Sequence, residues 1–220
     1  MLKNNFAYKE SLRVGMLLTA TAGYIDSYTF AFHDEKFASF QSGNILQLGI
    51  NLANGHLMVA LQFLAPILGF LLGAMLNQVI KQIAQRRQKA WEPLAVLIEL
   101  IGIFIVGILE IAHAPSLLVI SLLGLFMAIQ ADTFGKLRGM PYATVLSTGN
   151  LKTFGATIAN GLLNHDAAEF IKTRNVGVVL LAFFASAIVS HFLTLLIGNW
   201  TLILAPLFLL GVLFFIRQDV

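Results

Sequence analysis

The sequence predicts an all-α polytopic membrane protein with six transmembrane helices and two re-entrant half-helix segments, arranged as an inverted-topology internal repeat. Three observations predict this fold: the composition, a repeat within the chain and the placement of the basic residues. Hydrophobic residues make up 58% of the 220 residues and charged residues 11%, with a mean hydropathy of +0.82. A soluble domain carries about 25% charged residues. We therefore expect residues 1–220 to form one membrane domain.

The composition also narrows the function. The chain has no cysteine, which excludes disulfides, thiolate metal sites and a cysteine nucleophile. The net charge of +3 fits the basic cytoplasmic loops of a membrane protein better than a nucleic-acid surface. The sequence contains no nucleotide-binding loop, zinc-protease motif or serine nucleophile elbow. We expect no enzyme, cofactor, metal or nucleic-acid partner. The expected partners are the lipid bilayer and a small-molecule or ion substrate, and a homo-oligomer stays open.

An internal repeat organises the chain. Residues 37–55 begin with Phe-Ala-Ser-Phe-Gln-Ser-Gly-Asn and end with Ala-Asn-Gly, and residues 142–161 form a second copy. An offset of 106 residues aligns the two Gly-Asn pairs and the two Ala-Asn-Gly triplets. The same offset carries Asp26 onto Asp132, and the aligned stretch shares 8 identities in 34 positions. Such a repeat indicates two related halves.

Six apolar stretches are long enough, or nearly so, to cross a bilayer, which needs about 20 residues of helix. They lie at about 12–32, 57–80, 94–112, 116–135, 176–197 and 199–216. Two further segments, 39–55 and 142–161, contain the Gly-Asn copies. Each half is thus expected to hold a span, a Gly-Asn segment and two more spans, the first half at about 11–112 and the second at about 116–218.

The basic residues predict that the Gly-Asn segments do not cross the membrane. With six spans and a cytoplasmic N-terminus, twelve basic residues lie inside, Lys36 lies outside and Lys152 falls within the second segment. With eight spans, six basic residues lie inside and seven outside. Cytoplasmic loops carry the excess of Lys and Arg. The sequence therefore predicts six spans, with both termini in the cytoplasm.

Three spans per half is an odd number, so the second half is expected to enter the membrane in the opposite orientation, as in many secondary transporters. The stretch from Asn44 to Asn54 has 11 residues, or about 16 Å of helix. This is about half the hydrocarbon thickness. Two such half-helices, entering from opposite faces, are expected to meet near the midplane.

The starts of these half-helices form the candidate binding site. The residues concerned are Ser42, Gly43, Asn44, Thr148, Gly149 and Asn150. Serine, threonine and asparagine cap the first N–H groups of helices, and glycine permits the close approach of a ligand. The free N–H groups of a first turn attract anions. The alternative is that these segments serve only to pack the bundle.

Three charged residues complete the candidate site. Asp26 and Asp132 lie late in their spans, where a carboxylate is costly in lipid and is expected to face the interior. Each is a candidate for binding a proton or a cation, and each is equally a candidate cap for the facing half-helix. Lys152 has no counterpart, because the offset places Leu46 there. We expect Lys152 to pair with an aspartate, to attract an anionic substrate or to extend toward the membrane surface.

The run Gly-Tyr-Ile-Asp-Ser-Tyr at 23–28, followed by the run at 37–44, resembles the YoaK-like family of bacterial integral membrane proteins, which is catalogued as a domain of unknown function. In that family an aspartate late in the first helix precedes a Thr/Ser-Gly-Asn segment. The resemblance covers essentially the whole chain, although Ser42 stands where threonine is more frequent. It implies a multi-pass protein of the bacterial cytoplasmic (inner) membrane and supplies no activity.

The function predicted from these features is a small secondary transporter of a small polar or anionic solute, coupled to protons or Na⁺, with its site at the midplane between the half-helices. The first alternative is a passive channel for a small solute. The second is a membrane protein without a transport function, such as a membrane enzyme or an assembly factor.

Overall fold

The computed structural model describes residues 7–216, and they form an all-α protein with one short hairpin. The α-helices are α1 (Leu12–Phe32), α2 (Gln41–Ala53), α3 (Leu57–Arg86), α4 (Glu92–Ile111), α5 (Ser116–Thr133), α6 (Ser147–Asn164), α7 (Ala167–Ile197) and α8 (Pro206–Ile216). The short elements are the 3₁₀ turns η1 (Tyr8–Glu10), η2 (Gly198–Trp200) and η3 (Leu202–Leu204), and the antiparallel strands β1 (Lys136–Leu137) and β2 (Met140–Pro141).

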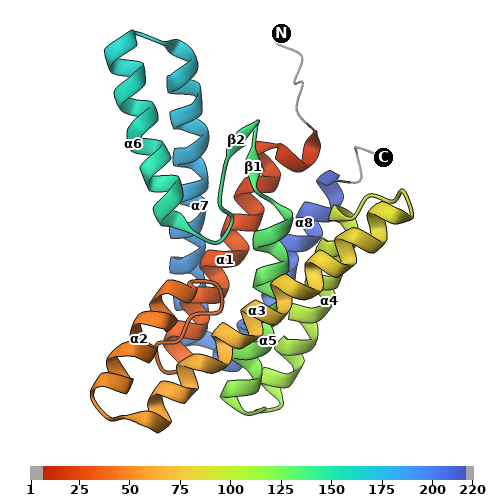
Figure 1. The fold of residues 1–220 in the computed structure, drawn as a ribbon, viewed down its shortest axis with the longest axis vertical. Helices are drawn as coiled ribbons and strands as arrows, with labels where there is room; N and C mark the ends of the chain where they lie inside the picture. The colour runs from red at the N-terminus through yellow and green to blue at the C-terminus, as the bar shows by residue number, and fades with distance from the viewer. Residues whose placement is uncertain (1–6, 217–220) are drawn as a thin grey trace.

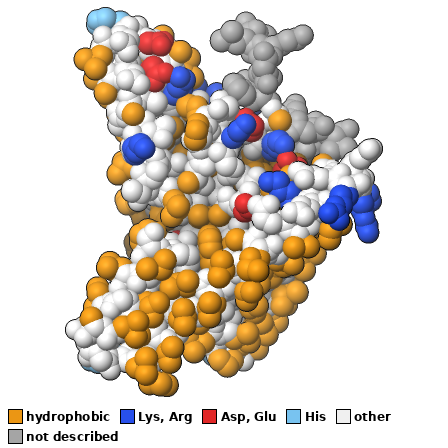
Figure 2. Space-filling model, viewed as in Figure 1, with side chains coloured by type: hydrophobic (Ala, Val, Ile, Leu, Met, Phe, Trp, Pro, Cys, Tyr) orange, Lys and Arg blue, Asp and Glu red, His pale blue; other side chains and the backbone are white. Residues whose placement is uncertain are grey.

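Four of these helices are long and apolar enough to cross a membrane: α3, α4, α5 and α7. The final apolar stretch, which includes α8, is shorter. Their outward faces carry many large exposed hydrophobic side chains, and Figure 2 shows these covering the lower part of the molecule. Lys and Arg side chains gather at the other end, near the α3–α4 turn and the start of α1 (Figures 1 and 2). The chain is therefore a multi-pass, all-α membrane protein.

Helix α1 lies at the centre of the bundle, in contact with α5, α7 and α8. Its residues Val14, Leu18 and Ile25 belong to one buried cluster with side chains of α4, α5 and α8. Its polar side chains are buried as well, among them Thr19 and Thr29. These polar residues lower the hydropathy of α1, and burial by neighbouring helices removes the need for an apolar outer face.

Glycines allow two pairs of helices to approach closely. A Cβ atom at Gly23 of α1 would lie 2.4 Å from the Phe183 carbonyl oxygen of α7. In α3, a Cβ atom at Gly69 or Gly73 would lie 2.1 Å from a carbonyl oxygen of α5. Real atoms cannot approach so closely, so the α1–α7 and α3–α5 contacts both depend on the missing side chain.

Helices α2 and α6, which contain the two Gly-Asn pairs, begin in the middle of the molecule and run to opposite ends (Figure 1). Helix α2 packs on α3, and α6 packs on α7. Helix α2 has 13 residues, whereas α6 has 18, as many as α5, so α6 is longer than the expected half-helix. The segment before each of the two helices is not helical.

The helix bounds differ from the expected spans in three places. Helix α7 begins at Ala167, where we expected about 176, because Asp166 caps it by accepting from the Ala168 N–H at 2.8 Å. Helix α3 continues to Arg86 beyond the expected 80. The expected span at 199–216 is broken into η2, η3 and an α-helix of 11 residues. Pro206 lacks an N–H group and therefore starts that helix rather than continuing one.

Candidate functional site

Each short helix is tied back to its own lead-in segment by an asparagine. The side-chain amide of Asn44 accepts from the Phe37 N–H at 3.0 Å and donates to the Phe37 carbonyl at 2.7 Å. Asn150 makes the same two bonds to Ala143, at 3.2 and 2.8 Å. An amide offers a donor and an acceptor side by side, which matches the N–H and C=O of one residue. Both asparagines thus close a seven-residue loop in front of a helix.

This geometry corrects the expectation that the Gly-Asn residues cap the helices. Helices α2 and α6 begin at Gln41 and Ser147, one residue before the expected serine and threonine. Their N-cap residues, Phe40 and Leu146, make no side-chain capping bond. The first N–H groups of both helices therefore have no side-chain cap. The positive ends of the two helix dipoles therefore lie in the middle of the molecule without a capping side chain.

Asp26 faces the start of α6 across a cavity. Its carboxylate is buried and accepts two hydrogen bonds from Ser39, one from the backbone N–H at 2.7 Å and one from the hydroxyl at 2.6 Å. The cavity has a volume of about 550 Å³ and a mostly apolar lining, and Ser147 and Thr148 of α6 line it together with Asp26. The hydroxyl of Ser147 is buried without a hydrogen-bond partner. Four phenylalanines complete much of the wall: Phe30, Phe37, Phe40 and Phe183.

Asp132 faces the start of α2 across a second cavity. This cavity has a volume of about 390 Å³, and Gln41 and Ser42 of α2 line it together with Asp132. The Asp132 carboxylate is half-buried and accepts from the Asn77 amide at 2.7 Å and from the Gln78 amide at 2.8 Å. Each aspartate therefore shares a cavity with the first turn of the half-helix from the other copy.

The remaining predicted residues lie apart from the carboxylates. A Cβ atom added at Gly43 would lie 2.9 Å from ring atoms of Phe37 and Phe40, so Gly43 packs closely against these two rings. Gly149, in contrast, faces open space. Lys152 is exposed on α6, and within residues 7–216 no ion pair joins it to either aspartate. Two of the three expectations for Lys152 thus remain, the attraction of an anion and extension to the membrane surface.

Sequence reasoning missed the residues that hold the two aspartates. Ser39 went unnoticed because its counterpart at the offset of 106 is Val145, so the repeat does not mark it. Asn77 and Gln78 carried a usable signal, because they are two adjacent amides late in an apolar stretch. Buried polar side chains in a membrane helix mark functional or packing sites.

Two other polar residues of the long helices were not among the predicted site residues. Glu99 is fully buried in α4, and its carboxyl group has no hydrogen-bond partner among the described residues. His191 is exposed on α7 and lines the larger cavity with Asp26.

The helices and cavities define a multi-pass, all-α membrane protein with two polar half-helix starts at its centre. The chain belongs to the DUF1275 family, proteins of unknown function, because the model of this family matches residues 14–215. No curated protein and no solved structure matches the chain. Membership of an uncharacterised family is thus confirmed, whereas the YoaK-like name and a bacterial origin stay predictions.

Proposed function

We propose that this protein is a small secondary transporter of a small polar or anionic solute, coupled to protons or Na⁺. One observation carries the proposal: two uncapped helix starts, 106 residues apart, each share a cavity with the aspartate of the other copy. Discontinuous helices whose N-termini point at an anionic group are the usual substrate sites of transporters built from inverted repeats. The proposal includes six membrane spans, two re-entrant segments and two halves of opposite orientation.

The proposed topology places the basic end of the molecule in the cytoplasm. Helices α2 and α6 run from the middle to opposite ends, which supports re-entry from opposite faces (Figure 1). The turns at the lower end, at 33–36, 54–56, 112–115 and 198–201, carry Lys36 as their one lysine or arginine. Both termini are then cytoplasmic, in the bacterial inner membrane.

The substrate is proposed to bind at the first turns of α2 and α6. There the first-turn N–H groups of α6 and the hydroxyls of Ser42 and Thr148 are the proposed donors to an anionic or polar group. In α2 the N–H groups of Gln41 and Gly43 already donate to the backbone carbonyls of Ser39 and Phe40. Asp26 and Asp132 are the proposed ion-coupling groups, because a carboxylate next to a bound anion is favourable only when it holds a proton or a cation. Lys152, one turn further along α6, adds positive potential.

Solute-driven proton flux tests the transport proposal. The purified protein is reconstituted into vesicles with a trapped pH dye, and phosphate, sulfate, lactate and glycine are offered one at a time against protein-free vesicles. We expect at least one of them to accumulate against its gradient with proton or Na⁺ movement, and Asp26→Asn and Asp132→Asn to abolish this. Asparagine keeps an oxygen that accepts from the Ser39 N–H, so the fold should survive.

Asp166→Asn is the matched control, because asparagine caps α7 as well as aspartate does. If a solute equilibrates without moving an ion, the protein is a channel. If both site variants transport normally, the aspartates are structural and the proposed site is wrong.

The absence of cysteine in the chain provides a direct test of topology. Single cysteines are placed at Glu35 and His56, two exposed residues that flank the first Gly-Asn segment. We expect a membrane-impermeant thiol reagent to label both from outside intact cells. Labelling of Glu35→Cys alone would mean that the segment spans the membrane and that the halves are not inverted.

A further inference from the structure

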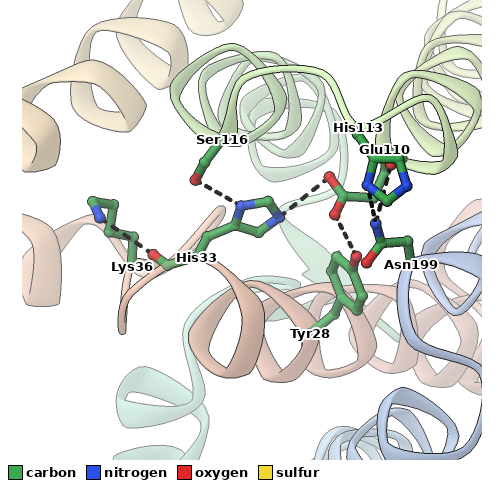
Figure 3. Close-up of polar contacts among 7 residues, drawn as sticks. All are labelled: Tyr28, His33, Lys36, Glu110, His113, Ser116 and Asn199. Carbon is green, nitrogen blue, oxygen red and sulfur yellow. Dashed lines mark hydrogen bonds and ion pairs between the residues drawn. The ribbon is translucent and has the colours of Figure 1, made fainter.

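A buried polar network joins the end of α1 to the last turn of α4 and the start of α5 (Figure 3). Glu110, in the last turn of α4, accepts from the Tyr28 hydroxyl of α1 at 2.7 Å. Its other carboxylate oxygen lies 3.5 Å from Nε2 of His33, which directly follows α1. His33 Nδ1 lies 2.8 Å from the hydroxyl of Ser116, the first residue of α5. The network therefore joins three helices through one imidazole ring.

Glu110 has one candidate counter-charge in this network. Its side chain is 7% exposed and that of His33 is 4% exposed. The nearby Lys36 is buried too, but its ammonium group donates to Asp34 and to the His33 carbonyl and lies over the Phe63 ring. Within the described residues, no lysine or arginine forms an ion pair with Glu110. A buried carboxylate without a partner cation is costly, so a protonated His33 ring is the counter-charge that this network offers to Glu110.

The His33 ring lacks one hydrogen bond. The 3.5 Å between Nε2 and the Glu110 oxygen is too long for an N–H···O bond, and Nε2 is buried with no hydrogen-bond partner in the part of the chain that the structure describes. On the other side of the ring, a serine hydroxyl either donates to a bare Nδ1 or accepts from Nδ1–H. Ser116 therefore holds the ring in place in both charge states. The unpaired Nε2 facing a carboxylate is the position where a proton completes the network.

We propose that His33 and Glu110 form a second proton-binding site, with His33 Nε2 as the base, which makes transport respond to the external pH. This inference rests on the transport function proposed above, in which Asp26 and Asp132 remain the ion-coupling groups. One proton taken from water by Nε2 converts the neutral ring and the carboxylate into an ion pair. Nε2–H then donates to Glu110, and the distance shortens into the hydrogen-bonding range of about 2.7–2.9 Å.

The loop after His33 connects the proton site to the substrate cavities. Lys36, three residues after His33, donates from its ammonium group to the His33 carbonyl. The N–H and C=O of the next residue, Phe37, are hydrogen-bonded to the side-chain amide of Asn44. Ser39, in the same loop, donates both of its hydrogen bonds to Asp26. Movement of His33 toward Glu110 therefore acts on the loop that holds Asp26 and the start of α2. In the proposed topology this end faces outside.

The surroundings of His33 set the pH at which the site fills. The pKa of His33 is lowered from its usual 6.5, and burial is the main cause. Lys36 also lowers this pKa, whereas Glu110 and, less strongly, Asp34 raise it. The other polar groups at the network are Tyr28, Ser116, and the His113–Asn199 pair, which contacts the Glu110 carbonyl rather than its carboxylate. The site therefore fills at a lower external pH than an ordinary histidine would.

Histidine NMR of the protein in lipid nanodiscs tests this site without any substrate. The His33 signal is assigned by its loss in His33→Gln, and we expect it to titrate with a pKa below 6.5. Glu110→Gln removes the group that raises the pKa, so the same signal should then titrate at a lower pH still. His56→Gln, an exposed histidine at the same end, is the control and should leave the His33 titration unchanged.

The outcomes separate this proposal from the transport function. A His33 signal that does not titrate between pH 4 and 8, or one that Glu110→Gln leaves unmoved, overturns the proton site even if solute uptake is observed. In the vesicle assay, His33→Gln should lose the acceleration of uptake at acidic external pH while it retains uptake down a solute gradient. If no solute is taken up but His33 titrates as expected, the transport function fails and the proton-binding pair stands.

Discussion

Asp26 and Asp132 occupy equivalent positions in the two halves, yet the protein holds them by different means. Asp26 accepts from the backbone N–H and the hydroxyl of Ser39, and it is 5% exposed. Asp132 is half-buried and accepts from two side-chain amides of α3. A backbone donor in a closed loop cannot move without the loop, whereas the exposed amide of Gln78 changes rotamer freely. Within the two halves, Asp26 is therefore the fixed carboxylate and Asp132 the adjustable one.

The first prediction compares the removal of each carboxylate. Asp26→Ala leaves the buried Ser39 N–H without an acceptor, and we expect a loss of about 3 kcal/mol of stability. Asp132→Ala should cost about 1 kcal/mol, because Gln78 is exposed and Asn77 retains a contact to Thr133 at 3.4 Å. Thermal unfolding of the purified variants, followed by tryptophan fluorescence, measures the difference. Equal losses would show that the two carboxylates are held equally firmly.

The repeat predicted that a helix begins near each Gly-Asn pair, but it could not predict what the asparagines bind. A Gly-Asn pair before an apolar run fits both a capping residue and a loop-closing residue, because both use the same amide. The choice depends on the path of the preceding seven residues, which the sequence does not specify. The network at His33 was harder still, because its contacts join residues 82 and 83 positions apart in the chain.

The ends of three apolar helices were easier to predict, because their length fits the bilayer thickness. Helix α1 matches its expected range of 12–32, and α4 and α5 match theirs within two residues, whereas α3 and α7 extend beyond theirs. Pro206 starts α8 because it lacks an N–H group, but the two 3₁₀ turns before it had no signal in the sequence. The sequence thus predicted structural features that depend on a single residue, and it did not predict features that depend on contacts between distant segments.

The second prediction compares the two asparagines, where the halves are alike. Asn44→Ala and Asn150→Ala each remove a reciprocal pair of hydrogen bonds to the backbone of one lead-in residue. Each should cost about 2 kcal/mol, because a peptide N–H and C=O lose their partners. The same unfolding measurement applies, with Asn51→Ala as the control on the outer part of α2, where the amide bonds only within its own helix. A loss confined to Asn44 would limit the loop-closing role to the first half.

The third and smallest prediction concerns Gly49 and Gly155, which are equivalent by the offset of 106 and face open space on α2 and α6. Alanine has the higher helix propensity, so each glycine-to-alanine change should raise stability by about 0.5 kcal/mol or leave it unchanged. Gly73→Ala is the contrasting variant, since its Cβ would lie 2.1 Å from the Leu125 carbonyl, and it should unfold at a clearly lower temperature. If Gly155→Ala keeps its stability but loses uptake, another helix approaches this face during transport. Loss of stability at Gly49 or Gly155 would mean that a second copy of the chain covers it, because nothing within residues 7–216 does so.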